Sequence, residues 1–422
     1  MILLSRCMFS LKMNLILGLS SFLGQAKASD LDTWRQAFID SAKAEALSPN
    51  LIVRNLAILS LGLFECHNAH LKKFSSSLKE MDNPPENYDP ASATRGFSLV
   101  ISRVLHPSRK SFFDQIAHRN SIKSAKIGHN PSFKYGEDIA KKILHSRLDD
   151  GATTQTTYIP KTSPGNWRRT PPYFRPPEQP HWSSVKLFSI PNIREFIPPP
   201  PPQPSEKSYF EAVKEVKLLG SLNSPLRTPE QTASAKFWKD FSYSSTPPGH
   251  WNEIASTLAR EKKLIPLAES RLFALLNLAM ADAGIIAWEA KFHYHLWRPI
   301  HAIRHADEFR STRSLSNPNW QSLLESPPHP EYISGHACYS GAASEILRNF
   351  FGTDEMLFFV KGDYQNTEFK KYNSFSSCAQ EIANSRLWGG IHYRFSNTKG
   401  LQTGKRIALY TFKNTLSPKT NL

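Results

Sequence analysis

One long apolar segment constrains the fold of this 422-residue chain more than any other feature. It covers residues 267–297, begins directly after Pro266 and is followed by Pro299. Proline is tolerated in the first turn of a helix, but it ends or kinks a helix from within. A helix that is apolar over much of its length has to be buried. The segment therefore predicts a central core helix against which other helices pack.

The rest of the pattern is also helical. Apolar residues recur every three or four positions between residues 30 and 47, which is the helical period. Thr228-Pro229-Glu230-Gln231 forms a capping box with proline at the first helical position. Other helices are expected over 51–70, 93–105 and 132–148. Because no segment of useful length alternates between apolar and polar residues, we predict an all-α helical bundle.

Proline interrupts this pattern in the middle of the chain. Fourteen of the 31 prolines lie between Pro160 and Pro204, where they exclude a regular helix or a central strand. Six aromatic residues in the same stretch favour an irregular belt packed on the helices, although a flexible linker is the alternative. We therefore divide the mature chain into an N-terminal helical part (29–158), a proline-rich belt (159–207) and a C-terminal catalytic bundle (208–422).

Residues 1–28 are typical of an export signal. Arg6 and Lys12 precede a short apolar run over 13–24, and Ala26-Lys27-Ala28 fits the small-x-small cleavage rule. The run is shorter than the roughly 20 residues that a bilayer span needs. We expect cleavage near Ala28 and a secreted or periplasmic protein, with an uncleaved anchor as the alternative.

The charge balance favours an anionic partner. Lys and Arg outnumber Asp and Glu by 52 to 36, which gives a formal net charge of +16. The basic residues are spread along the chain rather than gathered in one run, so we expect no nucleic-acid partner. Outside residues 1–28, we also expect no membrane span.

Lys291 and Arg298 lie seven residues apart near the end of the expected core helix. At 1.5 Å per residue, this spacing places both cations on one helix face, about 10.5 Å apart along the axis. Two long cationic side chains on one face can converge on a single anion. The alternative is a solvated basic stripe.

Ser334-Gly335-His336 directly precedes a helical run over 337–350. Ser334 occupies the N-cap position, where its hydroxyl and the first-turn amides form an anion site that the helix dipole strengthens. Gly335 permits close approach of a backbone or ligand, and His336 is placed to act on an anion bound there. The alternative is an ordinary capped helix with a surface histidine.

Ser385-Arg386 is followed by five residues and then by His392. The planar guanidinium of Arg386 suits paired contacts to an oxyanion. Gly389 and Gly390 each disfavour a helix by about 1 kcal/mol, which indicates close approach of a backbone or ligand beside His392. The alternative is a core histidine at a helix break. Together the three segments predict a site for a tetrahedral oxyanion, in which one histidine binds the central atom and the other moves a proton.

These three motifs, Lys-x6-Arg-Pro, Ser-Gly-His and Ser-Arg-x5-His in this order, resemble the vanadium-dependent haloperoxidases of the type 2 phosphatidic acid phosphatase superfamily. Residues 57–70, 159–202 and 246–252 are similar to segments of the bacterial secreted branch. The resemblance thus extends over most of the mature chain. It implies an all-α bundle whose active site lies in the core of the C-terminal helices.

The resemblance also implies vanadate as the cofactor. Lys291, Arg298 and Arg386 would neutralise the vanadate oxygens, and Ser334 and the Gly335 amide would hydrogen-bond to them. Vanadium(V) would act as a Lewis acid without changing its oxidation state. Hydrogen peroxide and halide would be the substrates, hypohalous acid the product and a small organic molecule a further acceptor.

Both histidines receive roles from the same resemblance. His392 would bind vanadium, and His336 would act as the general acid and base. Two positions depart from the family pattern, because Ile333 stands where proline is frequent and Ser396 stands where an acidic residue is frequent. A carboxylate at position 396 would orient His392, so its absence leaves Asp282 or Glu289 as candidates for that role.

Three alternatives stay open at this point. A phosphatase of the same superfamily would use the same residues, with His392 forming a phosphohistidine and His336 protonating the leaving oxygen. A protein that only binds anions would need the same cations. The sequence is also compatible with either a monomer or a homodimer.

Overall fold

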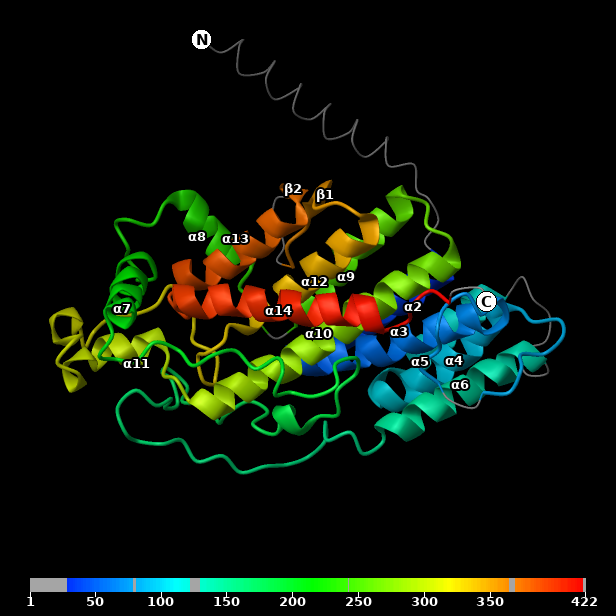
Figure 1. The fold of residues 1–422 in the computed structure, drawn as a ribbon, viewed down its shortest axis with the longest axis horizontal. Coiled ribbons are helices and arrows are strands. Elements are labelled where there is room, and N and C mark those ends of the chain that lie inside the picture. Colours follow the sequence, from blue (N-terminus) through cyan, green and yellow to red (C-terminus); the bar gives the residue numbers. More distant parts are fainter. Residues whose placement is uncertain (1–28, 79–80, 122–129, 242, 364–368, 420–422) are drawn as a thin grey trace, which may run out of the picture.

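The computed structural model describes residues 29–78, 81–121, 130–241, 243–363 and 369–419, so the predicted export signal at 1–28 lies outside the described residues. Within them the chain is an all-α bundle with one small hairpin, as the sequence predicted (Figure 1). Its helices are α2 (Asp30–Ala44), α3 (Pro49–Leu71), α4 (Pro90–Leu105), α5 (Lys110–Ser121), α6 (Pro131–Arg147), α7 (Lys207–Leu219), α8 (Pro229–Phe237), α9 (Thr246–Glu261), α10 (Pro266–Tyr294), α11 (Pro299–Arg304), α12 (Gly335–Phe351), α13 (Phe375–Trp388) and α14 (Arg394–Asn414).

Helix α10 is the core helix that the apolar segment predicted. It has proline in its first turn, is 29 residues long and is buried along most of its length. By length and hydropathy α10 resembles a membrane span, but 94% of its most apolar window is buried inside the protein. It packs against α3, α12 and α14. The helices that carry the site therefore rest on α10.

The helices before the belt form a second apolar cluster. Buried residues from α2 to α6 contact one another in this cluster, including Trp34, Phe38, Phe97 and Phe113. These helices gather at one end of the molecule, and α7 and α11 lie at the other (Figure 1). Helix α3 connects this second cluster with the core around α10, because one of its faces packs on α4 and α6 and another packs on α10.

The proline-rich belt packs on the helices and is not a free linker. Trp167 and Trp182 are buried within it, and its only helical turn among the described residues is the 3₁₀ segment Trp182–Ser184. Asp282 of α10 accepts hydrogen bonds from three consecutive backbone amides of the belt, at residues 188–190, over 2.7 to 3.0 Å. A buried carboxylate thus fixes the belt to the core helix.

The polyproline end of the belt is held by tyrosine hydroxyls. Tyr294 donates to the carbonyl of Pro198, and Tyr332 donates to the carbonyl of Pro199, each over 2.7 Å. Proline has no amide hydrogen, so a run of prolines contains no backbone donors that could pair with its carbonyls. These carbonyls therefore stay available as acceptors for other groups. Both tyrosines belong to segments that lead into the candidate site, so the belt braces that site.

The expectation that no segment forms a strand is wrong at one place. Strands β1 (Glu355–Val360) and β2 (Lys370–Ser374) form an antiparallel pair. In β1 only Phe358 and Val360 are buried, which is the alternation of a strand. Leu357 and Phe359, which alternate with them along the strand, are apolar but about half exposed. Apolar residues on both faces of β1 concealed its period in the sequence.

All three described cysteines are free thiols in the interior. Cys66 lies in α3, Cys338 in α12 and Cys378 in α13, and each is fully buried. The Cys338 thiol donates to the carbonyl of Ala283 in α10 at 3.4 Å.

Candidate active site

The three predicted segments meet around one cavity of about 440 Å³. Gly335, His336, Arg386 and His392 line it. Lys291, Arg298 and Ser334 lie behind its wall, where each is fully buried. The structure therefore brings all seven predicted site residues into one region, and their functional roles stay predictions.

Lys291 and Arg298 reach this region from different elements, so the prediction that they share one helix face is wrong. Helix α10 ends at Tyr294, and His295 adopts a left-handed conformation with φ of 54°. Arg298 is instead the N-cap residue of α11. The residue before a proline is disfavoured in helical geometry, and this prevents α10 from continuing into Pro299.

Lys291 holds the loop that leads to α12. Its ammonium donates to the carbonyls of Pro330 and Glu331, at 3.2 and 3.0 Å, and to that of Ile333. Burial, and next the charge of Arg298, lowers the pKa of Lys291 well below its usual range. An anion bound nearby would reverse this shift, because it would stabilise the charged form.

Arg298 connects that loop with the segment around His392. Its Nε and Nη2 donate to the carbonyl and the Nδ1 of His329, each over 2.9 Å. Its Nη1 donates to the carbonyl of Ile391 at 2.8 Å and contacts Nε2 of His392 at 3.1 Å. Burial lowers the pKa of Arg298 to about 10, so the guanidinium stays charged at neutral pH.

The hydrogen bonds of His392 determine which of its nitrogens carries the proton. Nδ1 lies 2.7 Å from a carboxylate oxygen of Glu331, and Nε2 faces Arg298, which can only donate. Nδ1 therefore carries the proton and Nε2 presents a lone pair. Burial, followed by the charges of Arg298 and Lys291, lowers the pKa of His392 well below its usual range. The ring is neutral, as a metal-binding imidazole has to be.

Glu331 supplies the carboxylate that the sequence left unassigned. It also accepts a hydrogen bond from the amide of Tyr393 at 3.0 Å. Burial raises the pKa of Glu331 to about 7, while Arg298, Lys291 and the Ser396 hydroxyl act in the opposite direction. Ser396 thus lies beside Glu331, and an acidic residue at 396 would place two carboxylates together. The carboxylate expected at position 396 is provided by position 331 instead.

The two acids considered for this role lie elsewhere. Asp282 binds the belt, and Glu289 faces His293, with 3.9 Å between the nearest atoms. Glu331 stands only three residues before Ser334, so its place in the motif loop was the signal that the sequence offered.

Ser334 caps α12, as predicted. Its hydroxyl accepts from the amide of Ala337 at 3.4 Å, and the helix begins at Gly335. A Cβ added to Gly335 would meet only the Trp288 and Tyr339 side chains, at 3.4 Å or more. No other backbone approaches Gly335 closely within the described residues, so this glycine leaves the start of α12 accessible to a ligand in the cavity.

The sequence missed Asp240, which faces His336 from the segment after α8. Its Oδ2 lies 3.3 Å from Nε2 of His336, and neither atom has another partner among the described residues. Burial, and next the charge of Arg386, lowers the pKa of His336 to about 4, with Asp240 opposing the shift. His336 is therefore neutral at neutral pH. Because 96 residues separate this pair, no local pattern could have identified Asp240.

Arg386 retains an unpaired donor at the cavity. It lies in the last turn of α13, and its Nη1 donates to the carbonyl of Trp238. Its Nε is buried and has no hydrogen-bond partner in the described part of the chain. Burial lowers the pKa of Arg386 to about 10, so it keeps its charge. An unpaired cationic donor of this kind suits an oxyanion.

The glycine pair before His392 allows two backbones to meet. Helix α13 ends at Trp388, and Gly390 has φ of 75°. A Cβ on Gly390 would lie 2.3 Å from the carbonyl oxygen of Gly220. The close approach inferred from the sequence is thus made by protein backbone, and it fixes the turn that carries His392.

Buried groups of both signs surround the site. Lys291, Arg298 and Arg386 supply the cations, and the carboxylates that act on them are Glu331, Asp240 and Glu178; burial raises the pKa of Glu331 to about 7 and also raises that of Glu178. Buried cations require compensation. Two neutral imidazoles, of which His392 turns its Nε2 lone pair toward Arg298, complete a donor set that fits a small oxyanion such as vanadate or phosphate.

Comparison with known proteins points to one family. A family model described as the VCPO second helical-bundle domain matches residues 271–418, which include all seven predicted site residues. The chain is 29% identical over 265 residues to the vanadium chloroperoxidase of Curvularia inaequalis, covering 52% of this chain and 43% of that protein. It is 33% identical over 114 residues to the vanadium-dependent bromoperoxidase of Ascophyllum nodosum, covering 23% and 20%. The chain thus spans less than half the length of these curated relatives.

A solved structure extends the similarity over nearly the whole chain. The crystal structure of a bacterial vanadium-dependent iodoperoxidase superposes with a TM-score of 0.80 at 26% identity. The match covers 93% of this chain and 97% of the other.

Proposed function

We propose that this chain, which belongs to the vanadium-dependent haloperoxidase family, binds vanadate and uses hydrogen peroxide to oxidise a halide to hypohalous acid. The observation that carries the proposal is the state of His392. Its Nδ1 is bound to Glu331, its Nε2 faces Arg298 at 3.1 Å, and the charges of Lys291 and Arg386 also act on the ring. This is the arrangement that a metal-binding histidine with a carboxylate partner requires.

The chain offers a ligand for vanadium as well as hydrogen-bond donors and positive charges for the vanadate oxygens. His392 Nε2 would bind vanadium, and the unpaired Nε of Arg386 would donate to a vanadate oxygen. Lys291 and Arg298 would supply positive charge from behind the wall, and the N-terminus of α12 would add its dipole. Bound vanadium(V) would contribute Lewis acidity toward hydrogen peroxide.

His336 is suited to move protons in this reaction. It lines the cavity, and its Nε2 faces the carboxylate of Asp240. A neutral ring with its Nε2 proton directed at a carboxylate keeps Nδ1 as a base. Its low pKa means that it gives up an accepted proton readily. His336 would therefore accept a proton from hydrogen peroxide and return it to the departing oxygen.

The test is one assay series on the purified protein, with and without added vanadate. We expect peroxide-dependent oxidation of iodide or bromide only when vanadate is present, and inhibition by added phosphate, which competes for the same cations. The companion assay measures hydrolysis of a phosphate monoester without peroxide or halide. Ester hydrolysis without vanadate, together with no halide oxidation, would establish the phosphatase alternative, which uses the same histidines.

Glu331→Gln should weaken vanadate binding by about 10- to 100-fold, the range typical of losing the carboxylate partner of a metal-bound histidine. The amide lacks the charge that makes His392 a better ligand. Titration of the apoprotein with vanadate, followed by tryptophan fluorescence, measures the affinity. Glu289→Gln is the matched control, because this acid of α10 lies away from His392 and should bind normally.

An exchange of positions sharpens this test. Glu331→Ser should bind vanadate more weakly than wild type. The double variant Glu331→Ser/Ser396→Asp should bind vanadate about tenfold more tightly than Glu331→Ser, because position 396 adjoins position 331. Full vanadate affinity in Glu331→Gln would contradict the role assigned to Glu331.

We also propose that residues 1–28 direct export. This proposal is supported by the basic start, the short apolar run and the Ala26-Lys27-Ala28 motif.

A further inference from the structure

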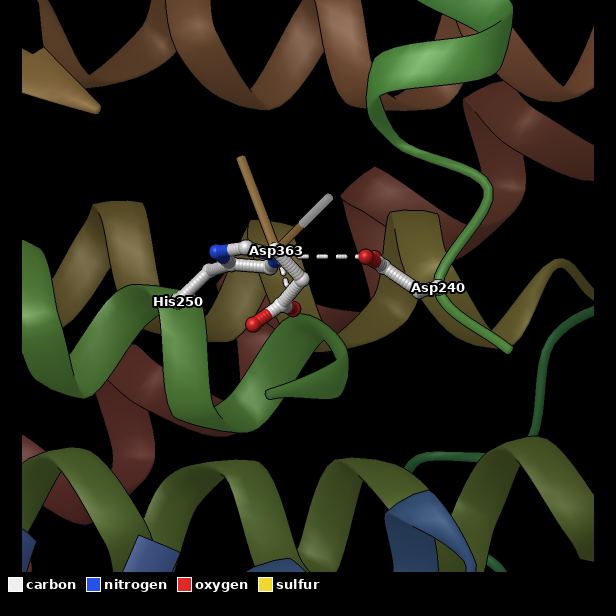
Figure 2. A group of neighbouring side chains, drawn as sticks. All are labelled: Asp240, His250 and Asp363. Atoms are coloured by element: carbon white, nitrogen blue, oxygen red, sulfur yellow. Dashed lines mark hydrogen bonds and ion pairs between the residues drawn. The ribbon is translucent and has the colours of Figure 1, made fainter. Parts of the chain in front are cut away.

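A chain of ionisable side chains extends from His336 to helix α2. His250 of α9 contacts Asp240 at 3.1 Å and Asp363 at 3.2 Å, both through Nε2. Figure 2 shows His250 with these two carboxylates, which come from different segments of the chain. Asp363 then pairs with Lys43 of α2 at 2.8 Å. Asp240 lies between His250 and His336, with one carboxylate oxygen toward each.

Asp363 is fixed independently of His250. The amide of Ser245 donates to one of its oxygens at 2.6 Å, and the Ser245 hydroxyl donates to the other at 3.0 Å. With Lys43, these contacts hold the carboxylate from three directions. His250 therefore has one firmly anchored partner, and its ring can transmit that position to Asp240.

The cluster already contains cations of its own. Burial alone would lower the pKa of His250, but Asp240 and Asp363 outweigh it and raise the pKa to about 10, with Glu253 of α9 acting in the same direction. The ring is thus an imidazolium that faces two carboxylates, and Lys43 adds a second positive charge beside Asp363 and Glu253. A divalent cation would have to displace the Nε2 proton and would lie close to the ammonium of Lys43. The geometry therefore favours an ion-pair network over a metal site.

The backbone of this segment is held in an unfavourable conformation. Asp240 and Thr246 have φ of 45° and 55°, in the left-handed region that non-glycine residues avoid. Conformations of this kind persist where surrounding contacts over-determine them, often at functional sites. The contacts of Asp240 and Ser245 with this cluster supply that constraint.

We propose that His250, anchored by Asp363, is a positioning residue that fixes the carboxylate of Asp240 and thereby orients the imidazole of His336. The inference rests on the proposed function where it concerns turnover, and on the geometry alone where it concerns His336. From the sequence, His250 was singled out only as part of residues 246–252, without a role, and Asp240 and Asp363 were not singled out.

His250 also acts on His336 through its charge. The charged groups that face His336 are Asp240, Arg386 of α13 and His250 itself. The positive charge of His250 lowers the pKa of His336, as does that of Arg386, whereas Asp240 raises it. Loss of the charge at position 250 should therefore raise the pKa of His336. A purely structural role would not predict this direction.

The first readout needs no cofactor. The apoprotein with ¹³C-labelled histidine is titrated by NMR, and the His336 signals are assigned by their loss in His336→Ala. We expect His250→Gln to raise the pKa of His336, whereas Asp363→Asn, which removes a negative charge and keeps the imidazolium, should not raise it. His293→Gln is the control, because His293 is exposed at the end of α10 and should leave His336 unchanged.

The second readout separates turnover from cofactor binding. In His250→Gln we expect kcat to fall about 10- to 100-fold, since a general base contributes about 10²–10⁴ and is displaced rather than removed. Vanadate affinity of the apoprotein should stay within about threefold of wild type. The acid limb of the kcat profile should move to higher pH, in parallel with the pKa of His336.

Three results would overturn the proposal. One is an unchanged His336 pKa and kcat in both folded variants, judged by their thermal midpoints. Another is a loss of vanadate affinity equal to the loss of kcat, which would place the effect on the whole site. The third is tight Zn²⁺ binding, with Zn²⁺ alone as the probe, that Asp363→Asn abolishes. If wild type oxidises no halide, the proposed function fails, while the NMR titration still decides the role of His250.

Discussion

Replacement of His392 by alanine is expected to abolish vanadate binding and halide oxidation together. The variant removes the imidazole whose Nε2 lone pair faces Arg298 and on which the charges of Lys291 and Arg386 also act. The remaining cations would still attract an anion, but they provide no ligand for vanadium. We expect activity to fall at least about a thousandfold, which corresponds to about 4 kcal/mol of transition-state stabilisation. Vanadate titration and peroxide-dependent iodide oxidation measure the two losses separately.

His305→Ala is the matched control for this variant. His305 follows α11, and its side chain is about 45% exposed. Its removal should change neither measurement. Full activity in His392→Ala would refute the assignment of this residue as the vanadium ligand, whatever the control shows.

Replacement of His336 by alanine should affect turnover far more than cofactor binding. A positioned general acid or base contributes about 10²–10⁴ to the rate, so we expect kcat to fall within this range. Vanadate affinity should stay within about tenfold of wild type, because the cations and His392 are intact. Single-turnover kinetics together with vanadate titration of the apoprotein distinguish the two effects.

Equal losses of binding and turnover in His336→Ala would argue against a proton-transfer role. Asp240→Asn provides the comparison, since it keeps the imidazole and removes only its carboxylate partner. Its kcat should lie between those of wild type and His336→Ala.

Neighbouring residues in the sequence were sufficient to predict the helices and one part of the candidate site. The apolar run with proline at both ends predicted α10, and Ser334 was correctly placed as the N-cap of α12. The aromatic residues of the belt correctly indicated packing rather than a free linker. Each of these features depends on residues that are neighbours in the chain, so the sequence displays them directly.

Contacts between distant segments could not be predicted in the same way. The left-handed turn at His295 moves Arg298 off the axis of α10, and no period in the sequence shows such a turn. Glu331 meets His392 across 61 residues, and Asp240 meets His336 across 96. Which carboxylate serves which histidine depends on the packing of α8, α12 and α13, and this packing becomes visible only in the folded chain.

The placement of the cysteines has a consequence under the proposed function, in which the protein would release a strong oxidant. Hypohalous acid attacks sulfur readily, and the thiolate is the reactive form of cysteine. Burial raises the pKa of Cys338 to about 12, and burial likewise raises the pKa of Cys66 and Cys378 well above the usual range. All three therefore remain protonated and shielded from solvent, even though Cys338 follows His336 by only two residues. If the protein produces hypohalous acid as proposed, this placement would protect its thiols from that product.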